Sequence, residues 1–349
     1  MGDTTRARLD GIEACRGIAA TAVVFYHAAR HLDHNYGVPF LIRTFQFGHA
    51  GVDLFFVISG FIILYVHYND IGRPARLGHY LRRRFTRVMP TYWIALALTV
   101  ALDTGGHKGC PSFVDLAWSA SLLPSNHELL LGIAWTLRYE IGFYAIFCAL
   151  IVHRSAGIAV LALWLAAVLL GTTGAVDLGW LPGSLYGVFN LQFFFGMAVA
   201  YAMRNTNIPA PRLILATGIA LFALVALAED CNLMDGYADT ARIAYGLPAA
   251  AIVLGAAAAG RQMKIAPWLR VLGAASYSIY LFQFIFIGIL WHAWLAAGLD
   301  RVMPHAASFP LLAVGAVAGG ILTSQWIEHP LIRLMRTFSF RSRALTIGG

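Results

Sequence analysis

Charged side chains are scarce in this chain. They make up 12% of its 349 residues, while hydrophobic residues make up 59%. Soluble domains carry roughly 25% charged residues. A soluble fold of this length could not bury so much apolar surface, whereas a lipid bilayer can accommodate it. The composition therefore argues against a soluble domain and favours an integral membrane protein.

Motifs of several other protein classes are missing as well. The chain has no zinc-ligand spacing and no RNA-binding motif, so neither a metal site nor nucleic-acid binding is expected. Its net charge of +8 comes from basic residues that recur between apolar runs rather than from one patch. No Gly-x-Ser-x-Gly elbow surrounds Ser59, and small residues in membrane helices usually permit close packing. Ser59 is therefore not expected to act as a covalent nucleophile.

Cysteine is also too rare for a disulfide framework. Cys15 and Cys148 fall in apolar runs, whereas Cys110 and Cys231 fall in loops predicted outside the cytoplasm. The four residues are either unrelated thiols or include one bridge, between Cys110 and Cys231.

What the sequence does contain is a series of apolar segments, each near the ~20 residues that a membrane-spanning helix needs. No repeat or low-complexity linker divides them, so we expect residues 1–349 to form one all-α membrane domain. Glu13 and Arg16 interrupt the first apolar run, which favours a retained helix over a cleaved signal peptide. The ten expected spans are 12–31, 50–69, 88–104, 134–152, 157–175, 185–203, 211–228, 241–259, 272–296 and 308–327.

The loops between these spans differ in charge. Arginine and lysine gather in cytoplasmic loops, and here most of them fall in alternate loops, six arginines lying between residues 70 and 88. The intervening loops hold only Arg43, Lys108 and Arg301, and the 227–239 loop is acidic. This asymmetry predicts ten spans with both termini in the cytoplasm. The longest outer loop, 105–133, is expected to fold into a cap or an interfacial segment.

Arg16 and His27 lie on the first span, although charge at a helix centre costs ~2.5–3.5 kcal/mol. Arg16 and His27 are eleven positions apart, so their side chains leave the same helix face, about 16 Å apart along the axis. They could line one polar shaft. Alternatively, Arg16 snorkels to the membrane interface, and His27 is a packed histidine bonded to a neighbouring helix.

Two carboxylates are predicted at a depth similar to that of His27, namely Asp53 on the second span and Glu140 on the fourth. A carboxylate can orient an imidazole and stabilise its protonated form, as general-base catalysis requires. The alternatives are that Asp53 caps or pairs at a helix end, and that Glu140 forms a structural ion pair with Arg138 or another helix.

The third span is preceded by Arg82-Arg83-Arg84-Phe85-Thr86-Arg87. Such a run can simply fix the orientation and contact lipid headgroups. The loop contains arginine and no lysine, however, and planar guanidinium groups grip phosphate in two-pronged fashion. A phosphate-bearing ligand is the more specific interpretation.

The chain resembles the acyltransferase-3 family of membrane O-acyltransferases, in particular the branch that modifies exopolysaccharides and O-antigens. A basic residue, ten intervening residues and a histidine form the family's signature, which Arg16 and His27 match. The resemblance extends along the whole chain, in the family's order, through 9–27 (LDGIEACRGIAATAVVFYH), 48–61 (GHAGVDLFFVISGF), 80–93 (YLRRRFTRVMPTYW), 135–144 (WTLRYEIGFY), 276–282 (SYSIYLF) and 326–331 (WIEHPL).

This resemblance implies about ten helices in the bacterial inner membrane. It implies acyl-CoA, usually acetyl-CoA, as a cytoplasmic donor rather than a tightly bound cofactor, and a hydroxyl of an extracytoplasmic or lipid-linked glycan as acceptor. His27 corresponds to the essential histidine, Arg16 to its basic partner, and Glu140 to the acidic residue of the fourth span. An Arg-x-Arg pair linked to donor binding corresponds to Arg82 and Arg84, with Arg87 as a further candidate because the register is ambiguous.

Other functions remain open at this point. A glycan or lipid transporter or flippase would have the same polytopic form, and a non-catalytic scaffold is a further alternative. Within the enzymes, the acyl group could be succinyl and the acceptor a peptide, an antibiotic or a lipid. The expected partners are acyl-CoA, a glycan, membrane lipids and a second copy of the chain. The sequence ends about twenty residues after the last expected span, so no appended extracytoplasmic domain is expected.

Overall fold

The computed structural model describes residues 3–105, 109–260 and 263–335, which contain helices and no strand. Lys108, which entered the charge comparison, lies outside this part of the chain. Short 3₁₀ or π turns join the helices: η1 (Gln46–Ala50), η2 (Tyr68–Asp70), η3 (Pro74–Arg76), η4 (Gly132–Ala134), η6 (Leu299–Arg301), η7 (His305–Ser308) and η8 (Ser324–Glu328). The α-helices are α1 (Asp3–Tyr36), α2 (Pro39–Phe45), α3 (Gly51–His67), α4 (Leu77–Gly105), α5 (Phe113–Ser121), α6 (Trp135–Val152), α7 (Arg154–Thr172), α8 (Gly183–Tyr186), α9 (Asn190–Asn205), α10 (Pro211–Asp230), α11 (Asp239–Ala259), α12 (Pro267–Ala296) and α13 (Phe309–Thr323).

The ten expected spans coincide with α1, α3, α4, α6, α7 and α9 to α13. Among the described residues, nine helical segments are long and apolar enough to cross a membrane, which confirms an all-α multi-pass membrane protein. The 34-residue α1 is not among the nine, because Glu13, Arg16 and His27 lower its hydropathy. Helices suit a bilayer because they satisfy every backbone polar group internally.

The helix α4 begins at Leu77, well before the apolar residues from which its span was predicted. Arginine is a good helix former, so the basic segment continues the helix rather than forming a loop. Arg82, Arg84 and Arg87 consequently project from the first turns of α4, at fixed positions relative to the membrane-spanning part.

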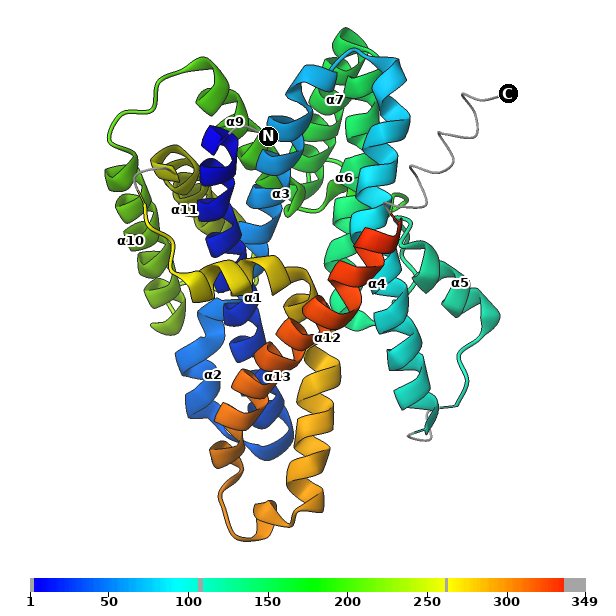
Figure 1. Ribbon diagram of the computed structural model, residues 1–349, viewed down its shortest axis with the longest axis vertical. Coiled ribbons are helices and arrows are strands. Elements are labelled where there is room, and N and C mark those ends of the chain that lie inside the picture. The colour runs from blue at the N-terminus through cyan, green and yellow to red at the C-terminus, as the bar shows by residue number, and fades with distance from the viewer. Residues whose placement is uncertain (1–2, 106–108, 261–262, 336–349) are drawn as a thin grey trace.

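α1 runs through the middle of the bundle (Figure 1), where it packs chiefly against α12 and also contacts α3 and α11. α3 packs closely against α9, since a β-carbon at Gly196 would collide with the Val57 carbonyl oxygen. By contrast, α7 and α10 leave large apolar side chains such as Leu163 and Leu213 exposed. A bilayer would cover such surfaces.

The 105–133 loop contains α5, which is docked on α4. The backbone N–H of Asp115 donates to the Ser112 hydroxyl at the start of α5, an N-cap. Tyr92 donates to the Ser119 carbonyl at 2.7 Å, and Trp93 to the Ala120 carbonyl at 2.9 Å. The described part of this loop is therefore folded against the bundle. All four cysteines are free thiols.

Candidate active site

A cavity of about 510 Å³ lies among α1, α3, α4, α6 and α12. Its volume falls in the range of small-molecule sites. We call it the arginine cavity, because five arginines contribute to its wall. It is lined by Arg16, Val52, Phe55, Phe56, Ile58, Ser59, Ile62, Ile63, His79, Arg82, Arg83, Arg84, Thr86, Arg87, Val88, Thr136, Leu137, Glu140, Tyr144, Ser276, Tyr277, Tyr280, Ile332 and Met335.

The wall of the cavity is divided between charge and apolar surface. Arg82 is exposed, whereas Arg84 and Arg87 are half-buried three positions apart on one face of α4. The α3 side contributes mainly apolar side chains, from Val52 to Ile63, a stretch that rises about 16 Å. A charged group with a long, less polar arm would match this division.

Arg87 is fixed by a buried carboxylate. Its guanidinium forms a 2.6 Å ion pair with Glu328, whose side chain is fully buried. The other carboxylate oxygen accepts a 2.6 Å hydrogen bond from Ser278. Glu328 belongs to the π-helical turn η8, a rare conformation that is frequent at functional sites. The charge of Arg87 is therefore largely compensated within the protein.

Glu140 projects from α6 into the same cavity. Its Oε1 accepts hydrogen bonds from the Ser59 hydroxyl, at 3.1 Å, and from Tyr144. Arg138, two positions earlier, points to another side of α6, where it donates to backbone carbonyl groups that include Ser125. The ion pair between Glu140 and Arg138 considered above is therefore not formed. Arg16 lines the cavity within electrostatic range of Glu140.

His27 lies farther along α1 than Arg16. Its ring meets those of Tyr26 and Phe284 edge-on, at centroid distances of 4.8 and 4.7 Å. The described residues that line the arginine cavity do not include His27, and none of them donates a hydrogen bond to its ring. The expected carboxylate partner of His27 is thus absent from this part of the structure.

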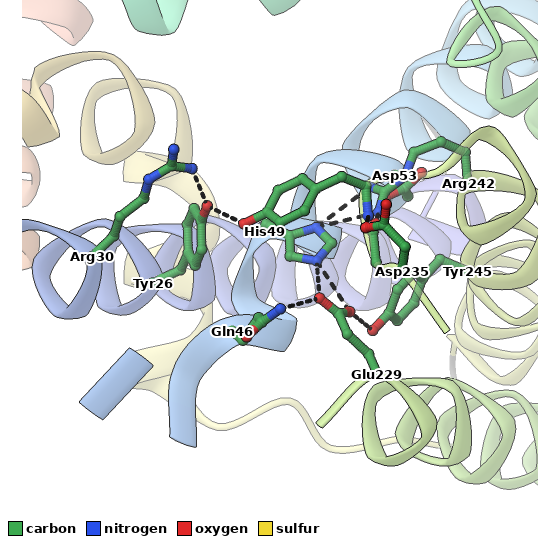
Figure 2. Close-up of polar contacts among 11 residues, drawn as sticks. Tyr26, Arg30, Gln46, His49, Asp53, Glu229, Asp235, Arg242 and Tyr245 are labelled. Carbon is green, nitrogen blue, oxygen red and sulfur yellow. Dashed lines mark hydrogen bonds and ion pairs between the residues drawn. The ribbon is translucent and has the colours of Figure 1, made fainter. Parts of the chain in front are cut away.

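Asp53 instead belongs to a second group of buried polar residues, which we call the His49 cluster: His49, Asp53, Glu229, Arg242 and Tyr245 (Figure 2). Asp53 is fully buried in the first turn of α3 and pairs with Arg242 of α11 at 2.6 Å. Gln192 donates to its other oxygen at 2.9 Å. The contacts of Asp53 therefore match the alternative stated above, in which it forms an ion pair at a helix end. The carboxylate of Asp53 binds Arg242 and does not contact the His27 ring.

His49 occupies the centre of this cluster (Figure 2). Its Nε2 lies 2.8 Å from Glu229, and its Nδ1 lies 3.4 Å from Arg242. Because a guanidinium only donates, Nδ1 accepts and Nε2 donates its proton to Glu229. Tyr245 donates to the second oxygen of Glu229 at 2.6 Å. Both ring nitrogens of His49 are thus occupied.

A pair of tyrosines connects this cluster with the surroundings of His27. The hydroxyls of Tyr26 and Tyr237 lie 2.5 Å apart, and Arg30 donates to Tyr26 at 2.6 Å. Tyr237, in the loop after α10, stacks on His49 at 4.9 Å. Burial raises the pKa of Tyr237, and its hydrogen bond to Tyr26 raises this pKa further. The Tyr237 hydroxyl therefore stays protonated at neutral pH, and His27 sits at the edge of a hydrogen-bonded aromatic layer.

The structure thus brings together Arg16, Arg82, Arg84, Arg87 and Glu140 in one cavity, and leaves His27 and Asp53 outside it. Sequence reasoning missed the polar cluster as a unit, because Glu229 falls in the acidic 227–239 loop and Arg242 at the start of the expected span 241–259. It considered Ser59 only as a nucleophile and missed its hydrogen bond to Glu140. In the sequence, the cluster is indicated only by charged residues at the ends of apolar runs. Such residues do not show which side chains contact one another.

Comparison with known proteins agrees with these features. Residues 9–328 match the acyltransferase domain family. The exopolysaccharide production protein ExoZ of Rhizobium meliloti is 31% identical over 341 residues, which cover 93% of this chain and 98% of that protein. Protein 2 in the picA locus of Rhizobium radiobacter is 35% identical over 97 residues, 27% of this chain and 43% of that protein.

No solved structure matches the chain. The family match nevertheless extends over most of the chain, from the first turns of α1 to the Glu328 that holds Arg87. The chain therefore belongs to the acyltransferase-3 family and is a membrane acyltransferase.

Proposed function

We propose that the protein transfers an acyl group, acetyl in the first instance, from cytoplasmic acyl-CoA to a hydroxyl of an exopolysaccharide or its lipid-linked precursor. The observation that carries this proposal is the arginine cavity. It combines exposed and half-buried guanidinium groups at one part of its wall with apolar side chains and one carboxylate deeper in. Acyl-CoA has the same division between its phosphates and its pantetheine arm.

In this proposal the phosphates of the donor bind Arg82 and Arg84, because guanidinium groups form paired hydrogen bonds with phosphate oxygens. Arg87, which Glu328 already pairs, stands beside them in the cavity wall. The pantetheine arm follows the apolar α3 wall past Arg16. Burial within the bundle excludes water, which protects the thioester from hydrolysis.

The transfer itself requires a proton acceptor. The acceptor oxygen attacks the thioester carbonyl carbon, the carbon–sulfur bond breaks, and the hydroxyl proton passes through a base to the departing sulfur. We assign the base to His27, whose ring nitrogens accept no hydrogen bond from described residues and are free for this role. Glu140 is the carboxylate of the cavity and stabilises positive charge that develops nearby. Asp53 is left out of the proton transfer, because Arg242 and Gln192 already occupy it.

The acceptor class is suggested by the relative that covers almost the whole chain, which is an exopolysaccharide production protein. Transfer to a glycan hydroxyl is the chemistry that an O-acyltransferase contributes to such a process. Transfer of succinyl instead of acetyl would add a carboxylate to the product. A peptide or lipid acceptor would be recognised because the acyl group would be found on that molecule rather than on a glycan.

The test has two parts. Purified protein in detergent or nanodiscs is supplied with acetyl-CoA and an exopolysaccharide repeat unit, and free CoA and ester formation are measured together. In parallel, the exopolysaccharide of a deletion strain is compared by mass with that of the parent. We expect acceptor-dependent CoA release and a missing acetyl mass. Transport of the glycan without ester formation would overturn the proposal, and an added mass of succinyl would correct the donor.

A further inference from the structure

Of the cavity arginines, Arg84 is held in a distinctive way. One of its terminal nitrogens donates a 3.2 Å hydrogen bond to Nε2 of His67, at the end of α3. The opposite ring nitrogen, Nδ1, lies 2.8 Å from Asp70 in the turn η2. Tyr144 lies beneath the guanidinium, 5.7 Å from its central carbon. The arginine is therefore oriented from two sides by groups that are not themselves on α4.

The hydrogen bonds determine the state of His67. Arg84 can only donate, so Nε2 must be an unprotonated acceptor, and the ring proton must reside on Nδ1, where it is donated to Asp70. His67 is 1% exposed, and Tyr80 covers it edge-on at 5.0 Å. Asp70, Arg84 and the neighbouring Arg83 are the charged groups that act on it. Asp70 thus fixes one tautomer of a neutral imidazole.

Because His67 is neutral, it leaves the positive charge of Arg84 uncompensated, whereas a carboxylate partner would neutralise that charge. Arg87 is paired with Glu328 at 2.6 Å, so most of its charge is compensated inside the protein. Arg84 receives orientation from His67 without a counter-charge. Its Nε is buried and has no hydrogen-bond partner among the described residues, on a side chain that lines the cavity. A buried unpaired donor of this kind is costly unless a ligand satisfies it.

From this arrangement we propose that His67 is a positioning residue for acyl-CoA binding: it orients Arg84 as an uncompensated guanidinium for a phosphate of the donor, with Asp70 holding its tautomer. The proposal rests on the donor assignment made above. It further assigns different tasks to two neighbouring arginines, Arg84 binding the anionic ligand and Arg87 maintaining the wall.

Two substitutions of His67 separate orientation from charge. The amide oxygen of His67→Gln can accept from Arg84 as Nε2 does, and His67→Glu offers an acceptor of the same length with a negative charge. We expect the KM for acetyl-CoA to stay within about threefold of wild type in His67→Gln. In His67→Glu the KM for acetyl-CoA should rise by about tenfold or more, which is the size of effect expected for one hydrogen bond to a charged group. The kcat should change much less. Equal KM values for the two variants would overturn the proposed role of charge.

A double-mutant cycle tests whether the effect passes through Arg84. His67→Leu should raise the donor KM about tenfold in the wild-type background and have little further effect in an Arg84→Ala background. Additive effects would overturn the positioning role. Leu64→Ala, a buried change on the same helix outside the cavity wall, serves as the control for packing loss. It should lower the thermal midpoint while leaving the donor KM unchanged.

The outcome also separates this inference from the function on which it rests. If wild-type protein releases no CoA with any acceptor, the proposed function fails. If wild-type protein is active while His67→Leu has an unchanged donor KM, only the role of His67 fails. Should His67→Leu fail to fold, the Gln and Glu variants still decide the question.

Discussion

Ser59 of α3 donates a 3.1 Å hydrogen bond to Glu140 of α6 inside the arginine cavity. Tyr144 donates to the same carboxylate oxygen, so Oε1 is occupied by two neutral donors. No described residue donates to Oε2. The carboxyl group is therefore held in place by neutral donors, and Arg16 is close enough to interact with a charge on it.

Replacing Glu140 by glutamine removes this charge and preserves the size of the side chain. We expect Glu140→Gln to lower kcat by about 100-fold, the lower end of the effect of a positioned acid–base or electrostatic group, with a nearly unchanged thermal midpoint. Turnover of acetyl-CoA with acceptor is the measurement. Ser59→Ala is the matched control, since it removes only one neutral hydrogen bond and should cost less than about tenfold. Equal losses in both variants would contradict a role for the charge.

His27→Ala should abolish glycan acylation without preventing membrane insertion. The His27 ring makes edge contacts with Tyr26 and Phe284 and no hydrogen bond with a described residue, so its removal disturbs little of the structure. Product mass and protein yield are measured together. His34→Ala, an exposed histidine in the last turn of the same helix, is the control and should be fully active. Normal product from well-expressed His27→Ala would eliminate the base assignment.

The buried pair of Asp53 and Arg242 should contribute to stability rather than to turnover. Arg242→Gln leaves the Asp53 charge uncompensated, and breaking a buried pair in this way costs about 3–5 kcal/mol. We expect a lowered thermal midpoint that is partly restored in the double variant Asp53→Asn/Arg242→Gln. Thermal unfolding in detergent is the measurement. A stable Asp53→Asn protein that has lost turnover would instead return Asp53 to the catalytic group.

Arg84 and Arg87 should respond differently to alanine although they share one helix face. Arg87→Ala leaves the fully buried Glu328 unpaired, so we expect it to destabilise the protein by about 3–5 kcal/mol. Arg84→Ala leaves only the neutral His67 without its donor and should mainly raise the KM for acetyl-CoA. Thermal midpoints and donor kinetics are compared for both variants. The reverse pattern would show that Arg87 is the ligand-binding arginine.

The sequence was sufficient for the helices but not for the partners of their polar residues. Long apolar runs predicted every spanning helix within a few residues at most ends, because the bilayer imposes length and hydropathy. One exception is α4, whose basic first turns were assigned to a loop although they are helical. The other is α1, which runs from Asp3 to Tyr36 and extends beyond the expected span 12–31 at both ends. The cost of buried charge also identified Arg16 and Glu140 as special residues, and the two share a cavity.

Partners across the bundle could not be predicted in the same way. Depth in the membrane suggested that Asp53 faces His27, but depth fixes only one coordinate and leaves the rotation and lateral position of each helix open. Asp53 and Arg242 are separated by 189 positions, and no spacing rule links such residues. The assignment of His67 to Arg84 was missed for a related reason, because polar residues near a helix end are common and attract no attention in a sequence.

The uninterrupted α1 fixes the spacing of two residues to which the proposed function assigns roles in the reaction. Arg16 and His27 lie on one rigid rod, about 16 Å apart along its axis, and no hinge between them can shorten that interval. In the proposed reaction, the acyl carrier has to bridge this interval. A donor with a truncated arm, such as a simple acyl thioester without pantetheine, would then occupy one end of the helix without reaching the other. Under this proposal, the length of α1 between the two residues would select acyl carriers by the length of their arm.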